Sequence, residues 1–280
     1  MLLIAAPIVA AALWMAAAML KTLPKGPLGR AVAYARNQWA ALKEYLDDGR
    51  LSISNNAAER AISLSEQLLR QWRLADVDDR TRALGEHLIG YIGVMGRQEG
   101  IDLLLEAVRC VVHDHGRRDV HFGLVGGGTS LEEMKALAAR LEVADYVTFT
   151  GRVPDAELLA MLNTADVCVN PDIANDMNDK STMNKIMEYM ALGKPIVQFD
   201  LTEGRFSARE ASLYARRNNA LDLASKILFL LENPEKRRAM GEAGRRRVLE
   251  ELEWRHEAPK LLAAYEALRA QGAARPRHAT

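Results

Sequence analysis

The feature that most constrains this chain is a repeated alternation of short apolar stretches and helical patterns from His87 onward. The apolar stretches have the length and β-branched content of strands, and helical periodicity follows each of them. Strand character covers residues 87–95, 119–128, 146–153, 166–172 and 194–200, and helical character covers 101–116, 130–143, 154–165, 183–192, 207–215, 221–232 and 234–270. Such repeated units predict an α/β fold with a doubly wound, Rossmann-like parallel sheet that binds ligands at the carboxyl ends of its strands.

The residues before this domain lack the alternating pattern and divide into three parts of different composition. Residues 1–20 are uncharged, rich in alanine and long enough to cross a bilayer. Two interpretations stay open for them. One is a membrane helix, with Lys21, Lys25 and Arg30 keeping the bulk of the chain in the cytoplasm and anchored to the inner membrane, and the other is a buried or incidental helix. Residues 21–63 predict a mainly helical extension, residues 64–86 a polar junction, and residues 269–280 a disordered tail.

Composition argues against several classes of protein. Acidic and basic residues number 37 each, so no overall charge attracts nucleic acid. Cys110 and Cys168 lie far apart in apolar segments, which predicts buried thiols in a reducing compartment. Asp172, Asp176 and Asp179 share a loop, but their spacing is not that of an EF-hand, and no metal site is predicted. A ligand anion must therefore be bound by local groups.

The stretch "NDKSTMNKIMEYMALGKPIV", residues 178–197, carries the densest set of groups suited to a ligand. Apolar residues recur in it with helical spacing and predict a face that packs on the sheet: Met183, Ile186, Met187, Met190 and Ala191. Ser181 and Thr182 would add hydroxyl donors to the free amides of the helix N-terminus, which suits a phosphate. Asn184 and Glu188 lie one turn apart, where a carboxylate would accept two hydrogen bonds from a ribose diol. Alternatively, Ser181 only caps the helix and Glu188 is solvated.

Four segments resemble, in order and spacing, the C-terminal domain of family-four glycosyltransferases with the GT-B fold. They are "HLIGYIGVMGRQEGIDLLLEA", "LVGGGTSLEEM", "VTFTGRVPDAELLAMLNTADVCVNPD" and the stretch just described. The resemblance covers residues 87–268 and is strongest to the bacterial group that makes surface or extracellular polysaccharide. It implies that this domain holds a UDP- or GDP-linked sugar as substrate, with no cofactor or metal, and that Glu188 binds the ribose.

The resemblance also implies a set of residues around the donor: Glu188, Ser181, Thr182, Asn184, Met183, Gly93, Gly96, Arg97, Lys180 and Arg152. The chain departs from the family pattern where charge matters. The first of the usual two acidic residues falls at Lys180, and the Arg and Lys that grip the diphosphate fall at Val94 and Glu99. Arg97 either replaces them or is a solvated loop residue, and Lys185 is a further candidate. No catalytic residue is assigned.

A second resemblance lies before the sheet. "NQWAALKEYLDDGRLSISNNAAERAI" is similar to the end of the catalytic domain of insertion-sequence transposases of the family numbered sixty-six, over residues 23–62. The resemblance implies that Glu59 matches the third carboxylate of a DDE metal site. Two-metal chemistry needs the other carboxylates as well, so a helix N-terminal carboxylate is the better interpretation of Glu59.

The two resemblances together predict a truncated glycosyltransferase. A GT-B enzyme reacts in a cleft between two domains, and here the transposase-like segment stands where the acceptor domain would be. We therefore expect a chain that binds the donor and transfers sugar weakly or not at all by itself. Two alternatives stay open: a transposase-derived DNA-binding remnant, and a sugar-nucleotide epimerase that shares the sheet.

Overall fold

The structure is a computed structural model that describes residues 85–253 and residue 256. Six strands form one parallel sheet: β1 (His87–Ile92), β2 (Val120–Val125), β3 (Val147–Gly151), β4 (Val167–Asn170), β5 (Ile196–Phe199) and β6 (Ser212–Ala215). Their order is β3-β2-β1-β4-β5-β6, so the strand order reverses between β1 and β4. This confirms the doubly wound, Rossmann-like sheet. In such sheets, ligands bind at the carboxyl ends of the strands beside the reversal.

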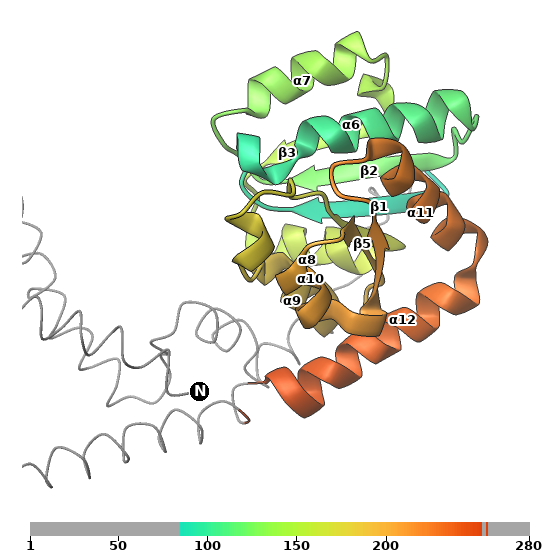
Figure 1. Cartoon of the computed structure of the whole chain (residues 1–280). Helices are drawn as coiled ribbons and strands as arrows, with labels where there is room; N and C mark the ends of the chain where they lie inside the picture. Colours follow the sequence, from blue (N-terminus) through green and yellow to red (C-terminus); the bar gives the residue numbers. More distant parts are fainter. Residues whose placement is uncertain (1–84, 254–255, 257–280) are drawn as a thin grey trace, which may run out of the picture. The chain divides into compact units, whose positions relative to one another are not determined.

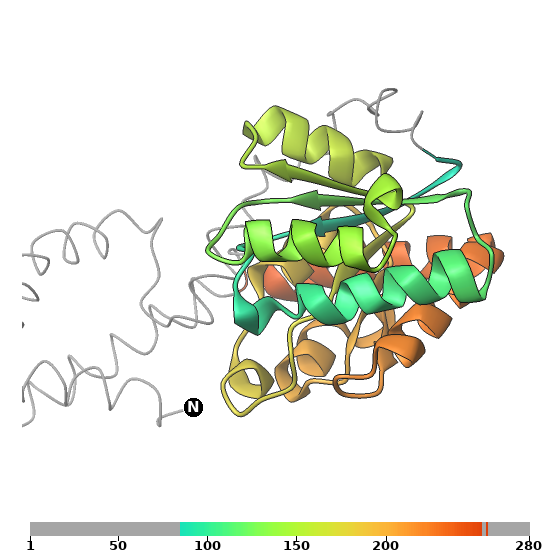
Figure 2. The same cartoon turned by 90° about the horizontal axis from the view of Figure 1, so that it is seen from above.

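Helices cover both faces of the sheet (Figures 1 and 2). One face carries α6 (Ile101–Arg109), α7 (Leu131–Arg140) and α11 (Ala220–Glu232). The other carries α8 (Asp155–Thr164), α9 (Asn184–Ala191) and α10 (Thr202–Ala208), and α12 (Pro234–Arg247) packs against α9. Short helical turns connect them: η1 (Arg97–Glu99), η2 (Cys110–Asp114), η3 (Ala144–Tyr146), η4 (Asn178–Lys180), η5 (Arg209–Ala211) and η6 (Val248–Leu252). Because both faces are covered, the central strands are mostly apolar.

The sixth strand is the main departure from the sequence pattern. The pattern predicts a short helix over residues 207–215, but α10 ends at Ala208 and residues 212–215 form β6. This prediction is wrong because β6 is only four residues long and gains its conformation by pairing with β5, from Ile196 with Ser212 to Phe199 with Ala215. Pairing with a distant segment outweighs local propensity in such a strand.

Several predictions concern residues 1–84, 254–255 and 257–280, which lie outside the described residues. They include the apolar segment, the transposase-like extension with Glu59, the end of the last predicted helix, and the tail. Within the described part of the chain, no helix is both long and apolar enough to cross a membrane. Cys110 and Cys168 are buried thiols, as predicted.

Candidate functional site at the carboxyl ends of β1 and β4

The two strands at the reversal separate toward their carboxyl ends. β1 and β4 pair over only two residues each, ending at Gly90 and Cys168. Beyond that point, the hydroxyl of Tyr189 from α9 accepts a hydrogen bond from the Ile92 amide at 2.9 Å and lies 3.3 Å from the Val169 carbonyl oxygen, to which it donates. One buried side chain therefore joins the two strand ends.

The loop after β1, residues 93–99, is called the β1 loop. It packs against the glycine turn after β2, residues 126–128. The Gly93 amide donates to Val125 O at 3.1 Å, and the Met95 amide donates to Gly127 O at 3.1 Å. The two loops approach so closely that a Cβ on Gly126 would lie 1.8 Å from the Gly93 carbonyl oxygen. Glycine is therefore needed at position 126, and also at position 128, where a Cβ would lie 2.4 Å from Met95 O.

The two glycines predicted to admit the donor differ in their surroundings. A Cβ on Gly93 would lie 2.4 Å from the Tyr91 hydroxyl, so glycine is required there by packing inside the protein. A Cβ on Gly96 would meet no atom within 4 Å, so open space lies beside this residue. The Tyr91 hydroxyl is 3.2 Å from Val94 O and 3.1 Å from Glu99 Oε2, so it contacts both ends of the loop.

Lys185 is a buried cation beneath this loop. Its Nζ lies 2.7 Å from Glu99 Oε2, 2.8 Å from Asp172 Oδ1 and 5.0 Å from the centre of the Tyr91 ring. Burial opposes the charge of Lys185, but Asp172 and Glu99 outweigh it and raise its pKa. Burial likewise opposes the charge of Glu99, yet Lys185 lowers the pKa of that carboxyl, whereas burial raises the pKa of Asp172 to about 6. Lys185, a candidate for the diphosphate, is therefore held by two carboxylates.

Glu188 and Asn184 are the polar groups of α9 that lack partners. Glu188 is half-buried, and within the described residues its side chain makes no hydrogen bond or ion pair. Burial raises its pKa to about 6, against the opposing charge of Lys185. Asn184, one turn earlier on the same face, has its Oδ1 buried without a partner. The carboxylate of Glu188 is therefore available to a ligand, and its role stays a prediction.

More unpartnered polar atoms lie at the carboxyl end of β4. Asn170 is buried, and neither its Oδ1 nor its Nδ2 has a hydrogen-bond partner within the described residues. Asp172 Oδ2 is also buried without a hydrogen-bond partner within the described residues. Buried polar groups are almost always paired, so such a concentration marks a functional site or bound water.

The hydroxyls before α9 have other partners than those predicted. Met183 is the N-cap residue of α9 and packs against the core between α8 and α9, and no side chain caps the helix. Ser181 Oγ donates to Met177 O at 2.7 Å, and Thr182 Oγ1 donates to Glu203 Oε1 at 2.6 Å. The alternative in which Ser181 caps the helix is wrong. Both hydroxyl protons go to protein acceptors, because the residues before α9 form an extended segment that binds to its neighbours.

The exposed cations come from three loops that follow strands. Arg97 lies in η1, Lys180 ends η4, and Arg152 follows β3; all three are exposed. Arg152 Cγ lies 3.8 Å from the position that a Cβ would take on Gly127, so this arginine sits beside the glycine turn. Because loops after parallel strands share one edge of the sheet, these cations lie at the edge formed by the carboxyl ends of β1 and β4.

Other polar residues of the motif hold the loops together. Asn178 Nδ2 donates to Gln98 O at 3.0 Å and to Ile173 O at 2.9 Å. Asp179 accepts hydrogen bonds from the Thr202 amide and from Arg217.

Sequence reasoning did not single out Tyr91 and Tyr189, which resemble ordinary core aromatics. A signal exists for both, since a buried tyrosine hydroxyl needs a hydrogen-bond partner.

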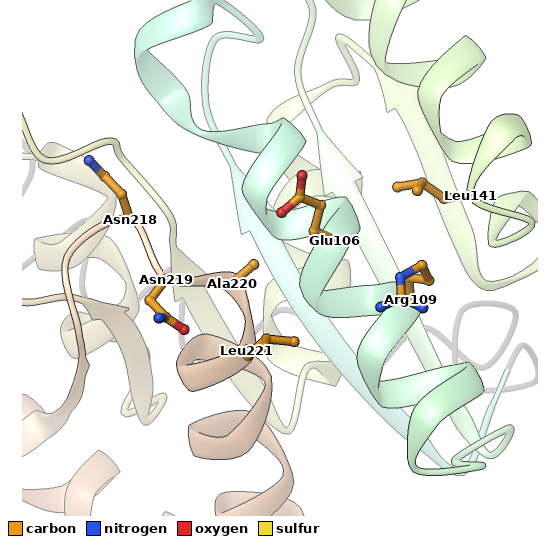
Figure 3. A pocket seen from close by; sticks show the side chains of 7 residues that line it. All are labelled: Glu106, Arg109, Leu141, Asn218, Asn219, Ala220 and Leu221. Atoms are coloured by element: carbon orange, nitrogen blue, oxygen red, sulfur yellow. The ribbon is translucent and has the colours of Figure 1, made fainter.

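A separate hollow of about 350 Å³ lies between α6 and the start of α11 (Figure 3). Side chains from both helices and from the end of α7 line it: Glu106, Arg109, Leu141, Asn218, Asn219, Ala220 and Leu221. None of the predicted donor residues belongs to this set. The hollow is therefore distinct from the candidate site at the carboxyl ends of β1 and β4.

The sheet order, with its reversal between β1 and β4, defines a Rossmann-like α/β domain. Residues 86–233, more than half of the chain, match the family described as "Glycosyl transferases group 1", and the chain belongs to that family. Residues 5–79 match the family described as "Transposase IS66 family". That match extends beyond residues 23–62 in both directions and includes most of the apolar segment at residues 1–20.

Curated relatives and solved structures agree with this assignment. The chain is 28% identical over 187 residues to a 2-deoxystreptamine glucosyltransferase of Streptomyces kanamyceticus, covering 65% of this chain and 46% of the relative. It is 30% identical over 175 residues to a GDP-mannose-dependent alpha-(1-6)-phosphatidylinositol monomannoside mannosyltransferase of Mycolicibacterium smegmatis, covering 59% and 44%. A sucrose-phosphate synthase structure from Thermosynechococcus elongatus matches with a TM-score of 0.60 and 26% identity, covering 71% of this chain and 51% of that one. The chain spans about half the length of these proteins.

Proposed function

We propose that residues 86–233 bind a nucleotide-diphosphate sugar in the crevice between β1 and β4, as the donor-binding part of a glycosyltransferase of surface or extracellular polysaccharide synthesis. The observation that carries the proposal is the half-buried, unpartnered Glu188 carboxylate, one turn from the unpartnered Asn184 Oδ1. A ribose diol offers two donors that a carboxylate accepts. The mannosyltransferase relative is named for GDP-mannose, which supports a sugar nucleotide as the ligand class.

The diphosphate would lie between the start of α9 and the exposed cations. No side chain caps α9, and the first amides of a helix have no partner within the helix. Arg97 and Lys180 are exposed on the loops at this edge. They take the place of the basic residues whose positions are occupied by Val94 and Glu99 in this chain.

Transfer by this chain alone is expected to be slow or absent. Residues 5–79 match a transposase, and orienting an acceptor against a donor is worth about 7–11 kcal/mol in catalysis. Purified full chain tested with a panel of UDP- and GDP-sugars should show saturable binding of at least one nucleotide sugar, with little transfer to added acceptors. Rapid acceptor-dependent turnover would contradict the expected inactivity, and failure to bind any sugar nucleotide would contradict the proposed function.

Donor binding is also expected to depend on pH. The pKa of Glu188 is raised to about 6, and only the ionised carboxylate accepts both ribose hydrogen bonds. Affinity for a sugar nucleotide should therefore fall about tenfold from about pH 8 to about pH 5. A nucleotide sugar is the suitable probe, since its diphosphate diester does not titrate in this range.

Asp172 also has a pKa of about 6, so the pH effect must be assigned to one carboxyl. Titration calorimetry of Glu188→Gln across the same range separates the two. The variant should bind weakly at every pH with little pH dependence. If it keeps the pH dependence of the wild type, Glu188 is not the titrating group.

A further inference from the structure

Three segments distant in sequence meet at one buried ammonium group, Lys185 Nζ. Lys185 comes from α9, Glu99 from the end of η1, and Asp172 from the segment just after β4. The carboxylate oxygens of the last two residues lie 2.7 Å and 2.8 Å from the ammonium nitrogen. The ammonium group thereby joins the β1 loop to β4 and to the helix that carries Glu188.

The β1 loop lies close to this group at its start and pairs with it at its end. At its start, a Cβ on Gly93 would lie 3.4 Å from Lys185 Nζ, and at its end the Glu99 carboxylate pairs with that atom. The Tyr91 ring lies under the ammonium, and its hydroxyl contacts Val94 O and Glu99 Oε2. Residues 95–98 therefore lie between two segments of the loop that lie close to Lys185 and contact Tyr91.

The charges explain why a cation is needed there. Glu99 and Asp172 are partly and almost fully buried, and without Lys185 two carboxylates would face each other with no counter-charge. Removing one partner of a buried pair leaves an uncompensated charge, which is strongly unfavourable. The more exposed partner, Glu99, lies on the loop, so the loop would be the part to move.

We propose that Lys185 is a positioning residue for donor binding, which neutralises Glu99 and Asp172 and so fixes the loop of residues 93–99 in the conformation that presents Gly96 and Arg97 to the diphosphate. This inference rests on the proposed function of the crevice. It assigns Lys185 no contact with the donor, because its ammonium group is already held by two carboxylates.

The test compares Lys185→Met with Lys194→Met in the full chain. Lys194, which follows α9, donates to Asn163 O and Ala165 O, away from the β1 loop. Lys185→Met should raise backbone amide exchange in residues 93–99 by about tenfold or more and weaken binding of a UDP- or GDP-sugar by a similar factor. Lys194→Met should leave both quantities near the wild-type values even where it lowers Tm.

A second variant guards against misfolding of the first. Glu99→Gln removes one ion pair at the more exposed partner and should also raise amide exchange in residues 93–99. Unchanged exchange in both variants would overturn the proposal, as would faster exchange with unchanged nucleotide-sugar affinity in Lys185→Met. If the wild type binds no nucleotide sugar, the proposed function fails, and the exchange data still decide whether Lys185 fixes the loop.

Discussion

Replacing Glu188 with glutamine is expected to weaken nucleotide-sugar binding by about tenfold to a hundredfold, with little change in Tm. Hydrogen bonds to a charged group contribute about 1.5–3 kcal/mol each, and glutamine keeps the shape while losing the charge. Stability should be preserved because the side chain of Glu188 makes no hydrogen bond or ion pair within the described residues. Titration calorimetry and thermal unfolding of the full chain measure the two effects.

The matched control for this variant is Glu235→Gln on α12. Glu235 is exposed and, among the residues that the structure describes, pairs only with Arg238 on the same helix, so its replacement should leave affinity and Tm unchanged. Loss of Tm in Glu188→Gln without loss of affinity would show that Glu188 supports the fold and does not bind the donor.

Replacing Gly126 with alanine is expected to lower the free energy of unfolding by about 3 kcal/mol or more. The new methyl group would lie 1.8 Å from the Gly93 carbonyl oxygen, and the φ of 131° is unfavourable for any residue with a Cβ. The Gly93 oxygen belongs to the backbone of the β1 loop, so relief of the clash requires that loop to move. Donor binding should be lost together with stability. Urea unfolding and calorimetry test both.

Gly116→Ala separates the effect of φ from that of the clash. Gly116 has a φ of 68°, but a Cβ there would meet no atom within 4 Å. Its replacement should cost only about 1 kcal/mol, from the left-handed backbone. Equal destabilisation by Gly126→Ala and Gly116→Ala would show that the clash with the β1 loop adds nothing to the loss of stability at position 126.

The local pattern predicts most of the sheet because a fully covered strand is an uninterrupted apolar run. The stretches at residues 87–95, 119–128 and 166–172 contain β1, β2 and β4, with the strand ends shorter than predicted. β6 is different, since its four residues have no recognisable pattern and depend on pairing with β5. The helical spacing of Ile186, Met187 and Met190 correctly predicts the face of α9 that packs on the sheet.

The polar part of the site is less accessible to sequence reasoning. The spacing of Asn184 and Glu188 places them on one face, because helical geometry alone decides it. The partners of Lys185 cannot be found in this way, since Glu99 lies 86 residues away and meets it only through the sheet order. The same holds for Thr182, whose hydroxyl donates to Glu203 of α10. Which polar groups stay unpartnered emerges only from the folded chain.

A crystal structure of the full chain with a UDP- or GDP-sugar would show where the nucleotide sugar binds. We predict the ribose hydroxyls within hydrogen-bond distance of the Glu188 carboxylate and the diphosphate between the start of α9 and the β1 loop. A nucleotide sugar bound elsewhere, such as in the hollow between α6 and α11, with Glu188 still unpartnered, would contradict it.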